Sequence, residues 1–511
     1  SYAWTDVLAG DTNIRAIFRP TIGGSDFLSN STQYLDVTMG SVPGRLLSGE
    51  LVVTYKADTA STRQMETVSY YLNQYTTAFG ATKSVFATTT VTISNANRHA
   101  TNVWYRVDER ATSPSSIILN GRVGTSSTER TATYSHTATN ARDGMTPRLI
   151  FDLSQDAGQI WNSTTTLAGA VTFAGGPPVA IEAMITFEWD GTQGGTETKS
   201  VQFGAAMSGL STTANGWMSA PVEVTLPETV TKTYRDAYLR TTVHHSHGTS
   251  ITAGNVTRGV NGTSSPNGIS VAEGADTTSE AIAADYLLRV SSSTFSNGDT
   301  ISCTTKKLQL VATLSVANTQ SFTHVLSVTY DAAYGEDGTT QDSRRLRTVE
   351  YTLGGTSDVT ARTSGTVAYA GSSWNTTAAS AGSRSVVLSG SNIRVAHAYV
   401  DVVAQPTTGT SITDQAVGLK VASSSNPNDY ARLEQISGTY WTTSAGTEHL
   451  HFVHDATALF DRQTDNDWAN GVPVTGMLSV TGPASILRTM KLIITYEYDY
   501  NPSAHTEVKT V

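Results

Sequence analysis

Hydrophobic and polar residues alternate at every second position in many stretches of this chain, which is the pattern of half-buried β-strands. One such stretch recurs four times, and in every copy a threonine is followed directly by an aromatic residue. The copies are ELVVTYKAD (50–58), AMITFEWD (183–190), VLSVTYDA (325–332) and KLIITYEYD (491–499). Their threonines are Thr54, Thr186, Thr329 and Thr495. The alternation predicts that the aromatic face packs into a core, whereas the threonine face, with its acidic residues, meets solvent.

The neighbours of these four anchor segments recur as well. An alternating run precedes each anchor segment. A polar loop follows it and leads to a tripeptide that is similar in all four copies, called here the short match. The matches are ETV (66–68), KSV (199–201), RTV (347–349) and KTV (509–511). We interpret each set as a three-strand meander, repeated at domain-sized intervals along a tandem array. The predicted units are 1–82, which is short and incomplete, and then 83–217, 218–381 and 382–511.

The predicted fold class is all-β. Many short strands separated by Gly, Pro, Asn and Asp turns indicate antiparallel β-sandwiches of Ig-like or jelly-roll-like topology, with very little helix. Short helical turns are expected near 154–161 and 454–462. The segment 279–290 has helical composition, but it could equally end in a strand.

Composition narrows the class of protein further. Only 15% of the 511 residues are charged, against about 25% in an ordinary globular protein, and serine and threonine fill the difference. The net charge of −10 and the lack of Lys/Arg clusters disfavour nucleic acid. Apolar runs are far shorter than the ~20 residues that span a membrane. With Cys303 alone, no disulfide can form within the chain.

Histidines cluster at two places. His449 and His451 lie at alternate positions with His454 nearby, and His245 and His247 repeat the spacing. Two histidines on one strand face can bind Zn²⁺ if a third ligand arrives from elsewhere. Because neither cluster carries a complete ligand set, we interpret them as surface or strand-edge residues, with a metal or inter-subunit site as the alternative.

An acidic segment, DRQTDNDWANG (461–471), resembles a Ca²⁺-binding loop. Asp465 and Asp467 fit the alternate positions that such a loop uses, but Ala469 stands where a third side-chain oxygen is needed. A solvated turn is the favoured interpretation. No cofactor is predicted, and Ca²⁺ is the alternative if the protein is extracellular.

Motifs for catalysis are missing from the sequence. It contains neither a G-x-S-x-G elbow nor an H-E-x-x-H motif, so no enzymatic activity is predicted. Trp374 and Trp441 stand in polar, loop-like settings, where an exposed indole can stack on a sugar or anchor a partner. Ordinary partial burial is the competing interpretation for both.

The sequence therefore predicts a structural protein that is extracellular or bound to the cell surface. We expect a subunit of a filament, tube, fibre or surface layer, which binds copies of itself head to tail through unpaired strand edges at its two ends. The alternative function is an adhesin, phage-fibre or carbohydrate-binding module that binds surface glycans through Trp374 and Trp441. A carbohydrate-active enzyme is the third hypothesis, and a chain that is an excerpt of a longer repeat protein would keep the structural role.

Overall fold

The computed structural model shows a chain built almost entirely from β-strands. The structure describes residues 52–57, 63–74, 83–91, 93, 99–109, 115–124, 128–136, 148–159, 165–173, 179–190, 195–211, 217–225, 232–245, 254–260, 263–264, 269–271, 282–289, 300–301, 305–314, 319–334, 344–355, 380–406, 414–421, 430–437, 450–481, 485–499 and 505–510. Within these residues the strands form three sandwiches and one separate two-stranded ribbon.

Sandwich 1 comprises eight strands and a short 3-10 helix. These are β2 (Arg63–Gln74), β3 (Lys83–Val91), β4 (His99–Glu109), β5 (Ser115–Val123), β6 (Arg130–His136), β7 (Arg148–Asp152), η1 (Ser154–Gln159), β8 (Thr165–Phe173) and β9 (Val179–Asp190). One sheet has the order β2-β9-β4-β7 and the other β3-β8-β5-β6, with all neighbours antiparallel.

Sandwich 2 repeats this arrangement with three additional short strands. Its elements are β10 (Gly195–Ser211), β11 (Trp217–Thr225), β12 (Lys232–His245), β13 (Gly254–Val260), β14 (Thr263–Ser264), β15 (Ile269–Val271), β16 (Ile282–Arg289), β17 (Thr300–Ile301), β18 (Thr305–Leu314) and β19 (Thr319–Tyr334). The sheets are β10-β19-β12-β16 and β11-β18-β13-β14, while β15 pairs with β13 and β17 pairs with β12.

Sandwich 3 follows the order of sandwich 1. Its elements are β20 (Arg344–Gly355), β21 (Ser380–Val386), β22 (Ser391–Pro406), β23 (Asp414–Val421), β24 (Tyr430–Ser437), β25 (Leu450–Asp455), η3 (Thr457–Leu459), α1 (Asp465–Asn470), β26 (Val472–Thr481) and β27 (Ser485–Asp499). Its sheets are β20-β27-β22-β25 and β21-β26-β23-β24. The ribbon pairs β1 (Val52–Ala57) with β28 (His505–Thr510).

The strand order identifies each sandwich as a jelly roll. If the eight main strands of a sandwich are counted along the chain, one sheet has the order 1-8-3-6 and the other 2-7-4-5. Successive strands therefore alternate between the two sheets except for the fourth and fifth, which pair in one sheet, as in a double-sheet jelly roll. The predicted all-β fold class is confirmed, and the topology is jelly-roll rather than Ig-like.

The sheets group the strands differently from the predicted units 1–82, 83–217, 218–381 and 382–511. The strands that carry ETV, KSV and RTV do not close the preceding unit: each one is the first strand of the next sandwich and pairs with its last strand. The expected meander does not form either. The chain passes from β8 to β9 between opposite sheets of sandwich 1, and β10 then begins sandwich 2.

The cores lie where the anchor segments predict them. Tyr330 and Tyr496, the aromatic residues of two anchors, are fully buried, as are Ile185, Val328 and Ile494 on the same face. In sandwich 3 the core continues through Phe460 and Trp468 beside η3 and α1. The expected aromatic core face is thus confirmed at every anchor whose side chains the structure describes.

Helices are few among the described residues. The helical turns expected near 154–161 and 454–462 are confirmed as η1 and η3. The ambiguous segment 279–290 contains the strand β16, and α1 was not expected. No described helix has the length and apolar character needed to cross a membrane.

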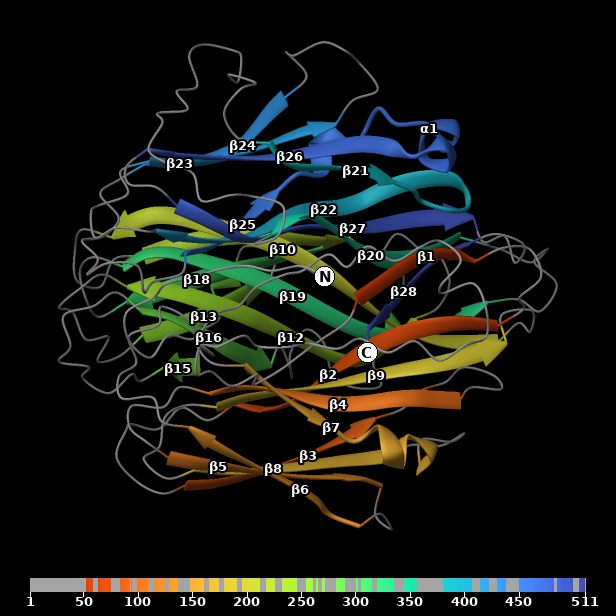
Figure 1. Ribbon diagram of the computed structural model, residues 1–511, viewed down its shortest axis with the longest axis vertical. Helices are drawn as coiled ribbons and strands as arrows, with labels where there is room; N and C mark the ends of the chain where they lie inside the picture. Colours follow the sequence, from red (N-terminus) through yellow and green to blue (C-terminus); the bar gives the residue numbers. More distant parts are fainter. Residues whose placement is uncertain are drawn as a thin grey trace, which may run out of the picture.

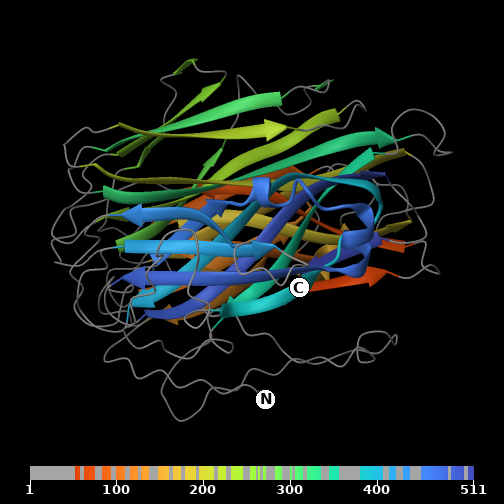
Figure 2. The same ribbon diagram turned by 90° about the horizontal axis from the view of Figure 1, so that it is seen from above.

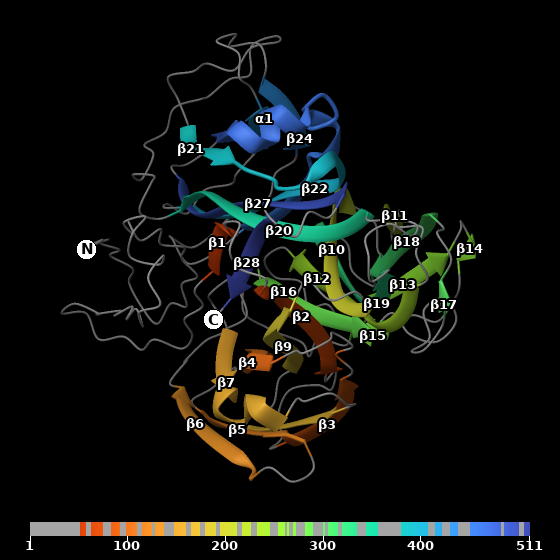
Figure 3. The same ribbon diagram turned by 90° about the vertical axis from the view of Figure 1, so that its right-hand side faces the viewer.

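The three sandwiches lie side by side. In each one, the sheet that contains the first and the last strand faces the other sandwiches. Sandwich 3 (blue) lies at the top of Figure 1, sandwich 2 (green) in the middle and sandwich 1 (orange) at the bottom. Seen from above, sandwich 2 lies beside sandwich 3 (Figure 2). The side view shows β1 and β28 between the upper and lower sandwiches, opposite sandwich 2 (Figure 3).

Candidate functional site: the joints between sandwiches

A pair of hydroxyl groups links the first strand to the last strand of every sandwich. In each pair one member belongs to an anchor segment and the other to the short match that follows the preceding anchor, which explains why both motifs repeat. The pairs are Thr67 with Thr186, Ser200 with Thr329 and Thr348 with Thr495, at 2.9, 2.6 and 2.8 Å between oxygens. The first strand is an edge strand in all three sheets, so its outer backbone groups need partners from elsewhere.

At the joint between sandwiches 1 and 2, polar side chains of sandwich 2 supply those partners for β2. The Ser69 amide donates to Ser200 Oγ at 2.9 Å, and Thr329 Oγ1 donates to the Ser69 carbonyl at 2.7 Å. Two residues further along, the Tyr71 amide donates to Asp236 Oδ2 at 2.7 Å. Side chains of one sandwich therefore bind the exposed edge of another.

The joint between sandwiches 2 and 3 repeats this geometry on β10. The Gln202 amide donates to Thr348 Oγ1 at 3.2 Å, and Thr495 Oγ1 donates to the Gln202 carbonyl at 2.9 Å. His397 Nε2 lies 3.0 Å from the Gly204 amide nitrogen. His397 thus stands where Asp236 stands in the first joint, because each residue is the register partner of its anchor threonine.

The threonine face of the anchors is consequently buried, which corrects the expectation that it meets solvent. Thr186, Thr329 and Thr495 are at most 1% exposed, and the acidic residues Asp331 and Glu497 on that face are 2% and 4% exposed. The alternation did reveal two faces of different polarity. The polar face, however, is covered by another sandwich and not by water.

Sandwiches 2 and 3 approach each other closely at the second joint, where the backbone at Gly204 lies directly against an aromatic ring. A Cβ atom placed on Gly204 would lie 2.6 Å from the Tyr399 ring, so only glycine fits there without displacing this tyrosine. The Tyr399 hydroxyl donates to Gln202 Oε1 at 3.1 Å, and the Phe203 and His397 rings pack at 5.6 Å between centroids. The joint is therefore packed as tightly as a core.

His397 connects this joint to the end of β25 through a chain of hydrogen bonds. With Nδ1 protonated, Nε2 accepts from the Gly204 amide, and Nδ1–H donates to Thr457 Oγ1 at 3.3 Å. The Thr457 hydroxyl in turn donates to Asp455 at 2.6 Å. Burial lowers the pKa of His397 below its ordinary value, although the charge of Asp455 and the Gly204 backbone oppose this shift.

Buried ion pairs surround the same first strands. Arg345 of β20 binds Glu197 of β10 at 2.6 Å, and Lys199 donates to the Leu346 carbonyl at 3.1 Å. Arg347 of sandwich 3 also approaches Glu66 of sandwich 1, at 3.6 Å. All three sandwiches therefore contribute charged residues to ion pairs across the joints.

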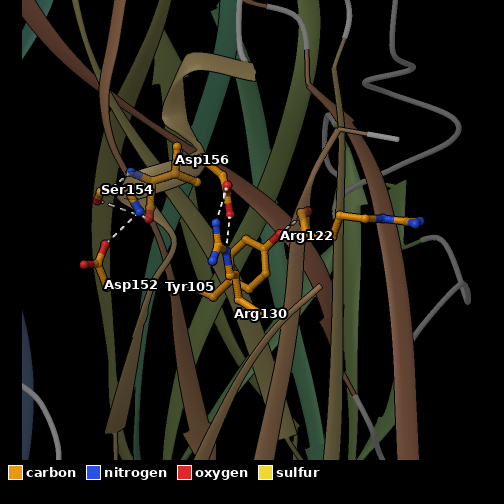
Figure 4. A network of polar contacts seen from close by, with 7 residues as sticks. Tyr105, Arg122, Arg130, Asp152, Ser154 and Asp156 are labelled. Carbon is orange, nitrogen blue, oxygen red and sulfur yellow. Dashed lines mark hydrogen bonds and ion pairs between the residues drawn. The ribbon is translucent and has the colours of Figure 1, made fainter. Parts of the chain in front are cut away.

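A separate polar network lies within sandwich 1 (Figure 4). Arg130 of β6 donates to both carboxylate oxygens of Asp156 in η1, at 2.8 and 3.0 Å. This bond lowers the pKa of Asp156. Ser154 begins η1, and its amide donates to Asp152 at 2.8 Å. The network ties η1 to an edge strand.

The acidic segment predicted as a solvated turn forms the helix α1. Asp467 accepts hydrogen bonds from the amide and hydroxyl of Thr464, which lower its pKa and complete a capping box. Asp465 accepts from the amides of Asn392 and Ile393 at 2.6 and 2.8 Å. Both carboxylates bind backbone, and these bonds use oxygens that a Ca²⁺ ion would need.

The structure describes only some of the other predicted site residues. His454 is buried at 1% exposure, and therefore does not lie on the surface. His449, Trp374 and Trp441 fall outside the described residues, and of His451 only the backbone position in β25 is described. No group of three or more potential metal-ligating side chains occurs in the part of the chain that the structure describes.

Comparison with known proteins adds no assignment. No family model matches the chain, and no curated protein does. Solved structures that share similarity include PBCV-1 VP54 fitted into a reconstruction of the virophage Sputnik (7% identity, 53% of this chain and 95% of that chain, TM-score 0.20). Another is the triple jelly roll of an archaeal virus turret (11%, 87% and 95%, 0.13). A third is the CBM22 tandem domain of Paenibacillus barcinonensis Xyn10C (10%, 59% and 92%, 0.16). At such low scores we base nothing on these similarities.

Replacing Thr495 by valine should destabilise the protein, although its sequence pattern suggests an exposed position. The valine cannot donate to the Gln202 carbonyl, and a buried group left without its bond costs about 1–3 kcal/mol. Chemical unfolding of T495V measures this loss. The control is Thr90→Val at an exposed site in β3, for which we expect a change within about 0.5 kcal/mol. Equal effects of the two substitutions would contradict the buried joint.

Gly204→Ala should loosen the joint between sandwiches 2 and 3. The new methyl group would overlap the Tyr399 ring, and such overpacking costs about 1–3 kcal/mol. The matched control is Gly158→Ala in η1, where a Cβ meets nothing within 4 Å. Thermal unfolding of both variants provides the comparison. If G204A melts like G158A, the close approach is not present in solution.

The stability of the protein should fall on acidification through His397. Because burial lowers the pKa of this residue in the folded state, the unfolded chain takes up its proton first as the pH drops below about 6.5. This histidine then contributes a loss of up to about 1.4 kcal/mol per pH unit until its folded pKa is reached. His397→Gln should remove that contribution. Unfolding free energies of both proteins between pH 7.5 and 5.5 test this, and parallel curves would count against it.

Proposed function

We propose that this protein is an extracellular structural subunit that assembles with copies of itself into a filament, tube, fibre or surface layer. The observation that carries the proposal is the joint: the sandwiches are locked by side chains that bind each other's strand edges. A subunit that bears load needs fixed angles between its domains, whereas relative motion is the ordinary expectation for domains joined only by linkers.

The jelly-roll topology supports the same proposal. Viral shells and lectins both use this fold, so the fold alone separates a structural role from a binding role only weakly. The joints favour the structural role over the binding role, because a glycan-binding module does not need three sandwiches fixed by buried ion pairs. A low fraction of charged residues, 15%, also suits a surface that packs against copies of itself.

The predicted assembly through unpaired edges needs one revision. The first and last described strands, β1 and β28, pair with each other, so one edge of each strand is already used within the folded chain. Assembly between copies then uses either the outer sheets of the sandwiches or an opening of this ribbon.

Negative-stain electron microscopy and sedimentation velocity of the purified chain test the proposal. We expect polymers or sheets with a regular repeat, increasing with protein concentration, because contacts between copies follow mass action. A chain that stays monomeric at all concentrations and ionic strengths would sink the proposal. Specific binding on a glycan array that is lost in Trp374→Ala or Trp441→Ala would then favour the alternative binding function.

A further inference from the structure

The two strands of the ribbon, β1 and β28, carry the motifs that mark the last and the first strand of a sandwich elsewhere in the chain. Strand β1 belongs to the first anchor segment, and β28 ends in the KTV match at Thr510. Their antiparallel pairing repeats the pairing of last with first strand that each jelly roll shows. The ribbon is thus the counterpart of β9 with β2, of β19 with β10 and of β27 with β20.

The ribbon also completes the series of joints. Sandwich 2 binds the edge of β2, and sandwich 3 binds the edge of β10. Strands β1 and β28 lie against β20, the corresponding edge of sandwich 3, while β28 itself lies against β2 (Figure 3). The ribbon therefore takes the remaining place in a cyclic arrangement in which each first strand lies against the following unit.

The register of the ribbon differs from that of the sandwiches. In all three sandwiches a hydroxyl residue of the first strand is the partner of the anchor threonine. In the ribbon Thr54 is opposite Val508, and Thr510 is opposite Val52. A shift of two residues keeps each side chain on its face, but it separates the two hydroxyls. The register within one chain thus differs by two residues from the register that aligns the hydroxyl residues in the other three pairs.

A two-stranded sheet is at best marginally stable by itself. The described residues add no third strand to the ribbon, whereas every other first-and-last-strand pair lies within a four-stranded order. A second copy of the chain carries an identical β28. If this strand replaced the chain's own β28, it would keep the contacts with β1, β2 and β20, and it could pair with β1 in the register shifted by two residues. Exchange of an identical element is a low-cost route from monomers to assemblies.

We infer that the ribbon is an exchangeable clasp, in which β28 of one copy pairs with β1 of another and brings Thr510 opposite Thr54. The inference rests on the proposed function and names the joint through which copies connect. Pairing within the chain benefits from an effective concentration that reaches the mM range for short flexible connections. Exchange is therefore favoured by high protein concentration and by the register that aligns Thr510 with Thr54, as the other three strand pairs align their hydroxyl residues.

The first experiment locks the clasp. Lys56 and Thr506 are register partners in the ribbon, so cysteines at both positions, in a chain with Cys303→Ser, should form a disulfide on mild oxidation. We expect the oxidised K56C/T506C chain to stay monomeric by sedimentation and microscopy, and a reductant to restore assembly. The control is T90C/T166C, a register pair inside sandwich 1, which should assemble whether oxidised or reduced.

The second experiment detects exchange directly. In the exchanged register Lys56 is opposite Val508, two residues from its partner within the chain. A concentrated mixture of K56C chains and V508C chains, each with Cys303→Ser, should give a disulfide-linked dimer on oxidation. The matched mixture of T90C and T166C chains should give none, because that pair remains inside one sandwich.

The outcomes separate the two proposals. If the locked chain assembles as well as its control, or if the K56C and V508C mixture yields no more dimer than the control mixture, the clasp is overturned while the structural function stands. If no variant forms polymers but the mixture still gives the cross-chain disulfide, exchange is supported as a route to small oligomers and the polymer function fails.

Discussion

An edge strand must satisfy the outward N–H and C=O groups of its backbone, and the structure depends on how these sandwiches meet that requirement. Many proteins blunt such edges with charges, proline or bulges. Here a pair of hydroxyls from the next sandwich accepts from an amide and donates to the carbonyl of the same residue, first at Ser69 and then at Gln202. Hydroxyls suit this task because each one both donates and accepts. The repeated threonine is therefore a connector between modules.

Buried charges fix the angle at which the sandwiches meet. A chain with few charged residues places Glu197, Lys199, Arg345 and Arg347 where they are almost fully buried. Replacement of such pairs by apolar residues is often neutral for stability, whereas removal of one partner is costly. Their contribution is thus geometric: the ion pairs are satisfied in one arrangement, and a rotated neighbour would leave a charge buried without its partner.

Alternation along the chain predicted the strands and the aromatic core, including Tyr330 and Tyr496, because these depend on local periodicity. It could not predict burial of the threonine face, since a polar face covered by another sandwich has the same sequence as one covered by water. Nor could the repeat reveal Asp236 and His397, which occupy equivalent positions with different chemistry. Helix α1 has a detectable signal in Thr464, three residues before an acid, but the acidic pattern of the segment favours a solvated turn.

The pairing of first with last strands has a consequence for how the chain is made. The hydroxyl partners are separated by 119, 129 and 147 residues in the three sandwiches. During synthesis each opening strand leaves the ribosome long before its mate, and such distant contacts form slowly. The growing chain therefore carries an uncovered strand edge for most of the translation of each jelly roll. A chain truncated inside a jelly roll would keep that edge uncovered, and uncovered strand edges favour aggregation.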